Sequence, residues 1–326
     1  MLQQRIAEFP AKTMVDVLRW KQIENPMADA PLIVVGVDHG RVVATRTAYA
    51  MDWRFGNHPE PVRSAVFGGT VVAKSHEGQG LVRKMTDKLF ALARARELAF
   101  GINLSPGRVV AGSSLRSGWV PVGPWDVLVR PKEGNQDAGQ PVFPEPSECV
   151  SLSSRNGIGL CLGRGRYQEM AELDASCLHG NTISCWKTPE YFSWRLSNSI
   201  TDYRVIYADR KGLQGYAVLG ARKKPDGVFI ASLIARSQEV AVLLLTAAVQ
   251  RFGFRGLIVS SCSLTGLDPQ CVRDLGFHPG NTPELLRRPY LLTDLGRKRV
   301  DFGNFFGIDC TRSSNWDASL LHTEVI

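Results

Sequence analysis

The sequence predicts a mixed α/β protein built from two tandem domains that arose by duplication. Each copy begins with a tryptophan followed by a basic residue, Trp20-Lys21 in the first and Trp194-Arg195 in the second. An apolar strand, a turn and a second apolar strand then follow, over residues 32–50 and again over 203–221. Period-2 apolar stretches broken by Asp and Gly are typical of strands joined by tight turns.

The ends of the two copies also match. A short helix closes on glycine in both, and an aromatic residue starts the next strand, at Gly118-Trp119 and at Gly276-Phe277. The spacing between copies falls from 174 residues (194 − 20) to 158 (277 − 119). Unequal loops indicate a duplicated domain rather than a short-period solenoid.

These signals divide the chain into a first domain over residues 1–130, a linker over 131–148 and a second domain over 149–326. The linker is rich in Gly, Pro, Asn and Gln, which is typical of a connecting segment. The last stretch, residues 301–326, has weak periodicity, and we expect an irregular tail packed on the second domain.

Composition sets the broad class. The 326 residues are 44% hydrophobic and 21% charged, with no apolar run long enough to cross a bilayer and no leader-like N-terminal stretch, so we expect a cytoplasmic protein. The seven cysteines are scattered without a metal-ligand pattern, which predicts reduced thiols and no metal site. A net charge of +8 indicates an anionic partner, either a small polyphosphate or a nucleic acid.

The most informative segment begins with an apolar strand at residues 66–73. It continues through Lys74-Ser75-His76-Glu77-Gly78-Gln79-Gly80 into an amphipathic helix over 81–98, with an apolar face of Val82, Met85, Leu89, Leu92 and Ala93. The glycines let the backbone approach an anion closely, and the free N–H groups of the first helical turn point toward it. A Gly-x-Gly turn alone is weak evidence, since it lacks the further residues of a dinucleotide or P-loop motif.

The order of elements around this turn is more specific. After the helix come a strand at 100–104, a small helix at 108–116 and the Gly118-Trp119 closure. This order resembles the acyl-CoA-binding half of the GNAT family of N-acetyltransferases. The resemblance implies acyl-CoA as co-substrate, with the pantetheine arm on Val71, Val72 and Ala73, and with CoA contacts from His76, Gly78, Gln79, Gly80, Leu81 and Val82.

Two positions depart from the family pattern. Ser75 stands where the family has glutamine or arginine, and Glu77 places a carboxylate beside the expected pyrophosphate. Basic residues close in sequence offset that charge: Lys74, Arg83, Lys84 and Lys88. In the second copy the corresponding loop, 236–240, has no glycine, so we expect it to bind no CoA and to help form the acceptor cleft.

Acyl transfer to an amine also needs a base and an acid. The family commonly supplies a tyrosine as acid from the small helix, but residues 108–116 contain none, which leaves Ser113 or Ser114. His179, in the polar loop 176–181, is the candidate base, and the alternative reading is an ordinary loop histidine. Asp52 and Glu60 are the carboxylate alternatives.

The tandem layout resembles N-acyltransferases that modify amino sugars in polysaccharide and lipoglycopeptide antibiotic pathways. It implies a primary-amine acceptor on a small molecule or glycoconjugate, and a donor that includes acyl chains longer than acetyl. One alternative is a Fem-type aminoacyl-tRNA-dependent transferase, which the positive charge suits but the Gly-Gln-Gly turn argues against. The other is a non-catalytic acyl-CoA sensor, which the missing tyrosine suits.

Overall fold

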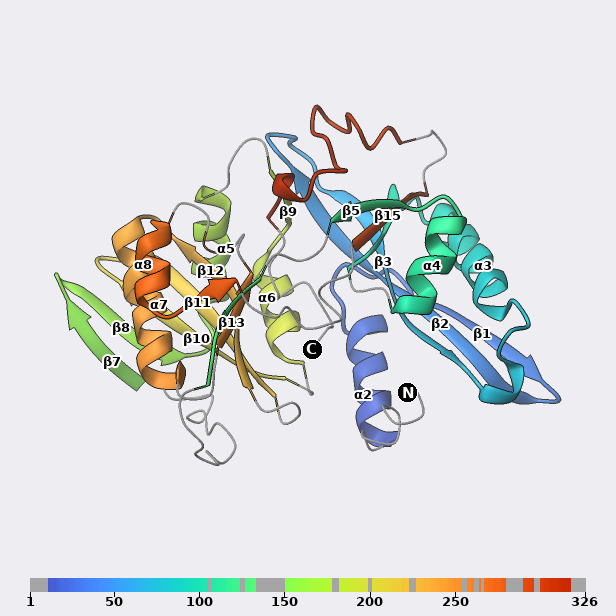
Figure 1. Ribbon diagram of the computed structural model, residues 1–326, viewed down its shortest axis with the longest axis horizontal. Helices are drawn as coiled ribbons and strands as arrows, with labels where there is room; N and C mark the ends of the chain where they lie inside the picture. The colour runs from blue at the N-terminus through green and yellow to red at the C-terminus, as the bar shows by residue number, and fades with distance from the viewer. Residues whose placement is uncertain are drawn as a thin grey trace. The chain divides into compact units, whose positions relative to one another are not determined.

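The chain forms two compact units in the computed structural model (Figure 1). Unit 1 contains Met1–Pro124, Gly180–Trp186 and Arg287–Trp316, and unit 2 contains the segments between and after these. The structure describes residues 11–104, 107–123, 127–132, 150–177, 182–198, 201–222, 227–253, 257–260, 264, 267–279, 290–295 and 300–317.

Unit 1 is built on a mixed sheet in the order β16-β9-β2-β3-β4-β15-β5, with β1 paired to β2. One helix precedes this sheet and two connect its strands: α2 (Ala11–Gln22), α3 (Leu81–Ala95) and α4 (Arg108–Arg116). The strands are β1 (Leu32–Asp38), β2 (Arg41–Phe55), β3 (Val62–Val72), β4 (Phe100–Asn103), β5 (Val120–Gly123), β9 (Ile183–Cys185), β15 (Tyr290–Asp294) and β16 (Trp316–Asp317).

Unit 2 has a sheet of the same design in the order β14-β6-β13-β12-β11-β10-β8-β7. Its helices are α5 (Tyr167–Ser176), α6 (Pro189–Leu196), α7 (Gln238–Phe252) and α8 (Pro269–Asp274). The strands are β6 (Val127–Arg130), β7 (Val150–Arg155), β8 (Ile158–Gly163), β10 (Asp202–Asp209), β11 (Leu213–Arg222), β12 (Gly227–Ala235), β13 (Leu257–Ser260) and β14 (His278–Pro279).

The duplication predicted from the sequence is visible in the closures after α4 and α8. Gly118 and Gly276 both have left-handed backbones, with φ of 83° and 81°. The next residues, Trp119 and Phe277, each donate a backbone hydrogen bond five residues back and are buried. A glycine is favoured there because a side chain strains the left-handed conformation.

The two copies exchange their last strands. β6 follows β5 along the chain but lies between β13 and β14 in the sheet of unit 2. β15 follows β14 but lies between β4 and β5 in the sheet of unit 1. The sequence predicts contiguous domains that divide near residue 130, whereas the units of the structure are interleaved; most of the expected linker lies outside the described residues.

Each sheet packs an amphipathic helix on one face. In unit 1, Leu89 and Ala93 of α3 join Ala48, Phe67 and Trp119 in the core. In unit 2, the longer apolar stripe of α7 covers β11 and β12. One residue of the predicted α3 face is misplaced, since Leu92 is 38% exposed.

The C-terminal segment packs differently from the expectation. Phe302 and Phe305 make edge-to-face contacts with Phe100, and Trp316 makes one with Trp53. Residues 300–316 therefore belong to unit 1. The prediction that this tail covers the second domain is therefore wrong. The cause is the exchange of β15, which brings the following residues to the first sheet.

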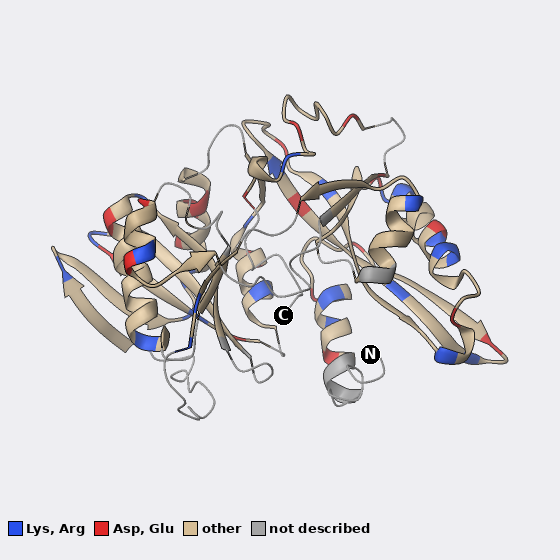
Figure 2. Cartoon of the chain, in the orientation of Figure 1, with Lys and Arg blue, Asp and Glu red and all other residues tan. Residues whose placement is uncertain are grey.

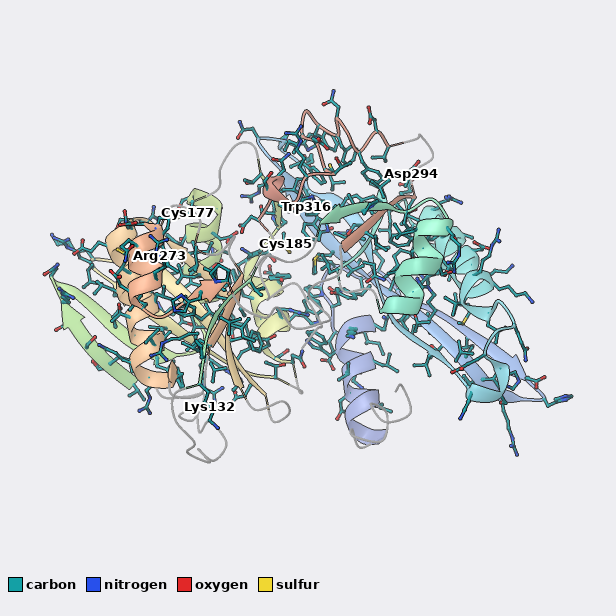
Figure 3. The ribbon with its side chains drawn as sticks, viewed as in Figure 1. Lys132, Cys177, Cys185, Arg273, Asp294 and Trp316 are labelled. Atoms are coloured by element: carbon teal, nitrogen blue, oxygen red, sulfur yellow. The ribbon has the colours of Figure 1, made fainter. Side chains whose placement is uncertain are left out.

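The cysteines are mostly as expected. Cys177, Cys185, Cys271 and Cys310 are free thiols (Cys177 and Cys185 are labelled in Figure 3), whereas Cys161 is bonded in a disulfide. The prediction of reduced thiols is thus wrong for Cys161. Within the described residues, no helix has the length and apolarity needed to span a membrane, and no group of three metal-ligating side chains occurs.

Candidate functional site

The predicted phosphate loop connects β3 to α3 in unit 1. Gly78 and Gly80 both have left-handed backbones, with φ of 77° and 72°, and a side chain built on either would meet nothing within 4 Å. Gly80 is the N-cap of α3 and gives it no side-chain cap, and the first turn of the helix carries no acid. The free N–H groups at this helix start are therefore available to an anion, with the helix dipole behind them.

The loop is tied to the β1–β2 hairpin through His76. Its Nε2 lies 3.1 Å from an Asp38 carboxylate oxygen, and its Nδ1 lies 2.9 Å from Ser75 Oγ. Gln79 Nε2 also donates to the backbone carbonyl of Ser75, at 3.4 Å. Both ring nitrogens of His76 thus have partners in the protein, and these contacts fix the shape of the loop.

Basic residues surround the start of α3. Lys74, Arg83, Lys84 and Lys88 are all exposed, and Figure 2 shows lysine and arginine along the outer side of this helix. Glu77, the carboxylate that departs from the family pattern, is also exposed. Water screens these exposed cations and carboxylates alike, and the four cations outnumber Glu77 and the neighbouring Asp87, so the local charge is positive.

A second feature lies along the strand that leads into the loop. β3 and β4 pair in parallel for three residue pairs only, ending at Val66 and Ile102, while β3 continues to Val72 against β2. Beyond the last pair, no strand of the described ranges lies beside the β4-facing edge of β3. Val71, Val72 and Ala73, the residues predicted to meet pantetheine, lie on this open stretch and are half-buried.

A β-bulge interrupts β3 within the open stretch. Two residues, Gly69 and Thr70, lie opposite Arg46 of β2, and Gly69 has φ of 58°. A side chain on Gly69 would approach Thr47 Oγ1 to 2.5 Å, so the bulge requires glycine. A bulge removes backbone groups from the strand ladder, which leaves them free for a ligand.

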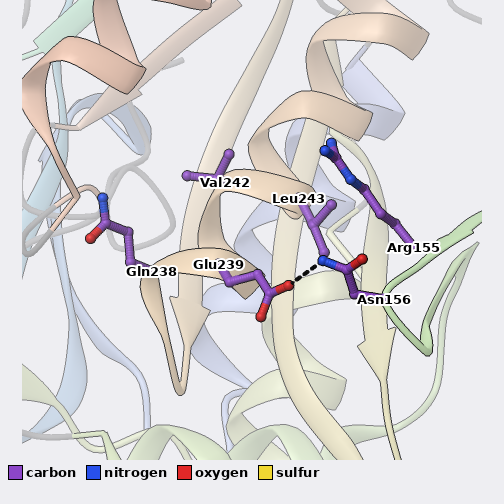
Figure 4. Close-up of a pocket in the computed structure, with 6 residues that line it drawn as sticks. All are labelled: Arg155, Asn156, Gln238, Glu239, Val242 and Leu243. Atoms are coloured by element: carbon purple, nitrogen blue, oxygen red, sulfur yellow. Dashed lines mark hydrogen bonds between the residues drawn. The ribbon is translucent and has the colours of Figure 1, made fainter.

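The corresponding helix start in unit 2 is closed. Ser237 is the N-cap of α7, and its hydroxyl accepts a hydrogen bond from the backbone N–H of Val240 at 3.3 Å. Glu239 adds a carboxylate in the first turn and accepts a hydrogen bond from Asn156 Nδ2 at 2.7 Å (Figure 4). The cleft beside this helix start, about 390 Å³, also has Arg155, Gln238, Val242 and Leu243 in its lining. A carboxylate and a side-chain cap occupy the positive end of α7, which disfavours phosphate.

The predicted catalytic residues lie in different surroundings. Asp52 is in a bidentate ion pair with Arg63, with Nε–Oδ1 and Nη2–Oδ2 distances of 2.8 and 3.2 Å. It is also seven residues along β2 from Thr45, which faces the bulge region, or roughly 23 Å. His179 lies outside the described residues. In α4, Ser114 is buried and Ser113 is half-buried.

The sequence analysis missed two buried charged features, one in each unit. Arg46 is buried beside the bulge, but its charge does not distinguish it in the sequence, because the same strand also carries Arg41, Asp52 and Arg54. In unit 2, Lys187 and Asp174 form a buried ion pair close to Cys177. Burial raises the pKa of the Cys177 thiol, so this cysteine is not activated as a nucleophile.

Comparison with known proteins independently supports the assignment of the first copy to the GNAT fold. Residues 7–107 match the family model described as an acetyltransferase (GNAT) domain. No curated protein sequence shows significant similarity to this chain.

Solved structures extend the likeness to most of the chain. A GCN5-related N-acetyltransferase from Anabaena variabilis is 14% identical, with a TM-score of 0.58 over 89% of this chain and 68% of that one. A tandem GNAT protein from the clavulanic acid biosynthesis pathway is also 14% identical, with a TM-score of 0.51 over 89% and 90%. The N-myristoyltransferase of Saccharomyces cerevisiae, solved with bound myristoyl-CoA, is 10% identical, with a TM-score of 0.51 over 86% and 71%.

At these identities the structures show a shared fold, and the GNAT fold supports acyl transfer to an amine. The open helix start and the diverging strands lie in the copy that the family model matches. The chain therefore carries a GNAT acetyltransferase domain in its first copy and has the tandem GNAT fold as a whole.

Proposed function

We propose that this protein transfers an acyl group from acyl-CoA to a primary amine, with the donor bound by unit 1 alone. The observation that carries the proposal is the contrast between the two helix starts. α3 begins at an uncapped glycine in open space, whereas α7 begins with a serine cap and an acid. Residues 78–82 would hold the pyrophosphate, and the free edge of β3 would hold the pantetheine amides.

The chemistry of this transfer requires one bond exchange. The ammonium first gives one proton to a base. The neutral amine nitrogen then attacks the thioester carbonyl, the carbon–nitrogen bond forms as the carbon–sulfur bond breaks, and the nitrogen loses a second proton while the leaving thiolate accepts one. We retain His179 as the candidate base. Its replacement by alanine should lower kcat roughly 10²–10⁴-fold with unchanged CoA affinity, and a variant with more than half of wild-type kcat would exclude it.

The geometry around Asp52 supports a structural role instead. Its carboxylate is held by Arg63, and it lies far along β2 from the bulge. For His76, the contacts with Asp38 and Ser75 support a role in shaping the loop rather than in contacting CoA directly.

We further propose an amino sugar as acceptor, on a polysaccharide or antibiotic precursor, in a cytoplasmic reaction. The support is the tandem architecture, which a protein of the clavulanic acid pathway shares. A non-catalytic acyl-CoA sensor is the second candidate, favoured by the absence of tyrosine from α4. The uncapped α3 argues against a Fem-type transferase.

Calorimetry with acetyl-CoA tests the donor site. Gly80→Val should weaken binding at least tenfold, about 1.4 kcal/mol, because the side chain enters the space of the phosphate. Gly212→Val is the matched control, since Gly212 is also left-handed, with φ of 116° and open space around it, in the β10–β11 turn of unit 2. If a folded Gly80→Val variant binds acetyl-CoA as tightly as wild type, the donor site is not in this loop. Slow hydrolysis of the acetyl-CoA thioester by wild type would indicate an enzyme, and its absence would favour a sensor.

A further inference from the structure

Arg46 is a buried cation whose charge is balanced by no acidic residue in the part of the chain that the structure describes. It lies on β2 between the buried Ala44 and Ala48, and it is 1% exposed. Its Nη1 donates to Thr70 Oγ1 at 2.6 Å, and its guanidinium lies over the Phe67 ring, 5.7 Å from the centroid. Among the described residues, its Nε has no hydrogen-bond partner, and no carboxylate lies within ion-pair distance of it.

Such an arrangement is unfavourable unless a ligand completes it. Burial lowers the pKa of Arg46 to about 10, which still leaves the side chain charged at neutral pH. A charge removed from water without an opposite charge destabilises the protein, and one hydroxyl and one aromatic ring offset only part of that penalty. An anion arriving with a substrate would offset the rest.

The position of Arg46 places that anion in the donor site. Phe67 and Thr70 belong to the part of β3 beyond its last pair with β4, where the strand edge is open. Thr70 precedes Lys74, the start of the loop toward the phosphate site, by four residues, or roughly 13 Å of strand. Arg46 is therefore at the opening between the strands rather than at the pyrophosphate.

The fold itself does not require an arginine here. Counting from the register shift in each hairpin, the pair Val34–Arg46 corresponds to the pair Ile206–Ala217 in unit 2. Ala217 is fully buried in the apolar core beneath α7. Unit 2, in which the start of α7 is capped, thus has alanine where unit 1, in which the start of α3 is uncapped, has Arg46.

Trp119 repeats this pattern on the same face of the sheet. Its ring packs on Phe67, with 5.3 Å between centroids, and its buried Nε1 has no hydrogen-bond partner among the residues that the structure describes. Its counterpart Phe277 has no such donor. Arg46 and Trp119 thus each place an unsatisfied hydrogen-bond donor beside the Phe67 ring, and both have apolar counterparts in the other copy. This arrangement indicates a ligand that would accept these hydrogen bonds.

We propose that Arg46 is a specificity residue that binds a carboxylate on the acyl group of the donor, so that the preferred substrate is a carboxyacyl-CoA. This inference rests on the proposed donor site in unit 1. A carboxylate fits because it brings the missing negative charge and accepts the hydrogen bond that Nε lacks. The phosphates of CoA have their own site at the start of α3.

The test compares succinyl-CoA with butyryl-CoA, which have the same chain length and differ in the terminal carboxylate. Wild type should bind succinyl-CoA about tenfold more tightly, as expected for a hydrogen bond to a charged group. Arg46→Met should abolish this preference and leave the affinities for butyryl-CoA and free CoA unchanged. Arg46→Lys, which keeps the charge without the guanidinium geometry, should retain part of the preference.

Two controls separate this role from a structural one. Arg54→Met changes an arginine near the other end of β2, which lies over Trp186, and should leave the preference intact. Without ligand, Arg46→Met should unfold at an equal or higher temperature than wild type, because an unbalanced buried charge has been removed.

The other outcomes overturn the proposal in distinguishable ways. Equal affinity of wild type for both thioesters, or an unchanged preference in Arg46→Met, would exclude the carboxylate site while leaving the donor site intact. Equal weakening of all three ligands by Arg46→Met would assign Arg46 to the CoA arm instead. Absence of binding by any of them would refute the donor site as well.

Discussion

Lys187 Nζ lies 2.6 Å from Asp174 Oδ1 in unit 2, and the two side chains are only 1% and 4% exposed. Tyr216 adds a second contact by donating its hydroxyl to the same oxygen at 3.3 Å, and burial raises the pKa of this phenol well above 10. Between Asp174 and Lys187 the chain leaves unit 2, adds β9 to the sheet of unit 1 and returns. The ion pair therefore fixes both ends of the segment that contains His179.

Breaking this pair should be costly. Lys187→Met leaves the Asp174 carboxylate buried without its cation, and we expect a loss of about 3–5 kcal/mol in the free energy of unfolding. Urea denaturation measures this loss. The double variant Lys187→Met with Asp174→Leu should recover most of it, and Lys132→Met, at an exposed lysine, is the control. A double variant no more stable than the single one would show that the pair is not the source of the effect.

The contact between His76 and Asp38 predicts a coupled effect on donor affinity. His76→Ala should raise the dissociation constant for CoA several-fold because the loop is no longer held to the hairpin, and Asp38→Ala should do the same. If the tether is the cause, the double variant should be no worse than either single one. Additive effects would instead support direct contact between His76 and CoA.

Stoichiometry checks the contrast between the copies. Titration of the full chain with acetyl-CoA should give one site, because Ser237 and Glu239 already occupy the start of α7. Two equivalent sites per chain would contradict this. A chain with Gly80→Val should then show no residual high-affinity site.

Cys310 predicts how stability depends on alkaline pH. Burial raises the pKa of this thiol from 9.0 to about 12, so between these values the unfolded chain releases a proton that the folded chain keeps. Its contribution to stability is complete below pH 9 and is lost as pH rises toward 12. The thermal midpoint of wild type should thus fall more steeply as pH rises above 9 than that of Cys310→Ala. Parallel slopes in the two proteins would show that this thiol does not titrate as expected.

The local features of the fold could be predicted from the sequence because interactions between residues close in the chain determine them. Each of these features depends on residues only a few positions apart in the chain. They are the Gly-Gln-Gly turn, the helix closures at Gly118 and Gly276, and the apolar face of α3. Arg46 could not be distinguished from the other charged residues of β2 by sequence. Its burial without a counter-charge depends on which residues from β3 surround it.

The exchange of β6 and β15 between the two sheets could not be predicted from local sequence. β6 and β15 have similar apolar character, and each would satisfy either sheet by pattern alone. Which sheet each one joins depends on residues more than a hundred positions away. The pair of Asp52 and Arg63 depends on the β2–β3 register, which places these two residues opposite each other.

The exchange has a consequence for synthesis of the chain on the ribosome. Asn103 of β4 pairs with Leu291 of β15, and 188 residues (291 − 103) separate them. At translation speeds of about 5–20 residues per second, the first sheet waits on the order of 10–40 s for its missing strand. During that interval the nascent β4 edge has unpaired backbone groups and is open to association with other chains. We therefore expect the yield of folded protein to increase with added chaperones and with a lower growth temperature, and to do so more than the yield of a single GNAT domain.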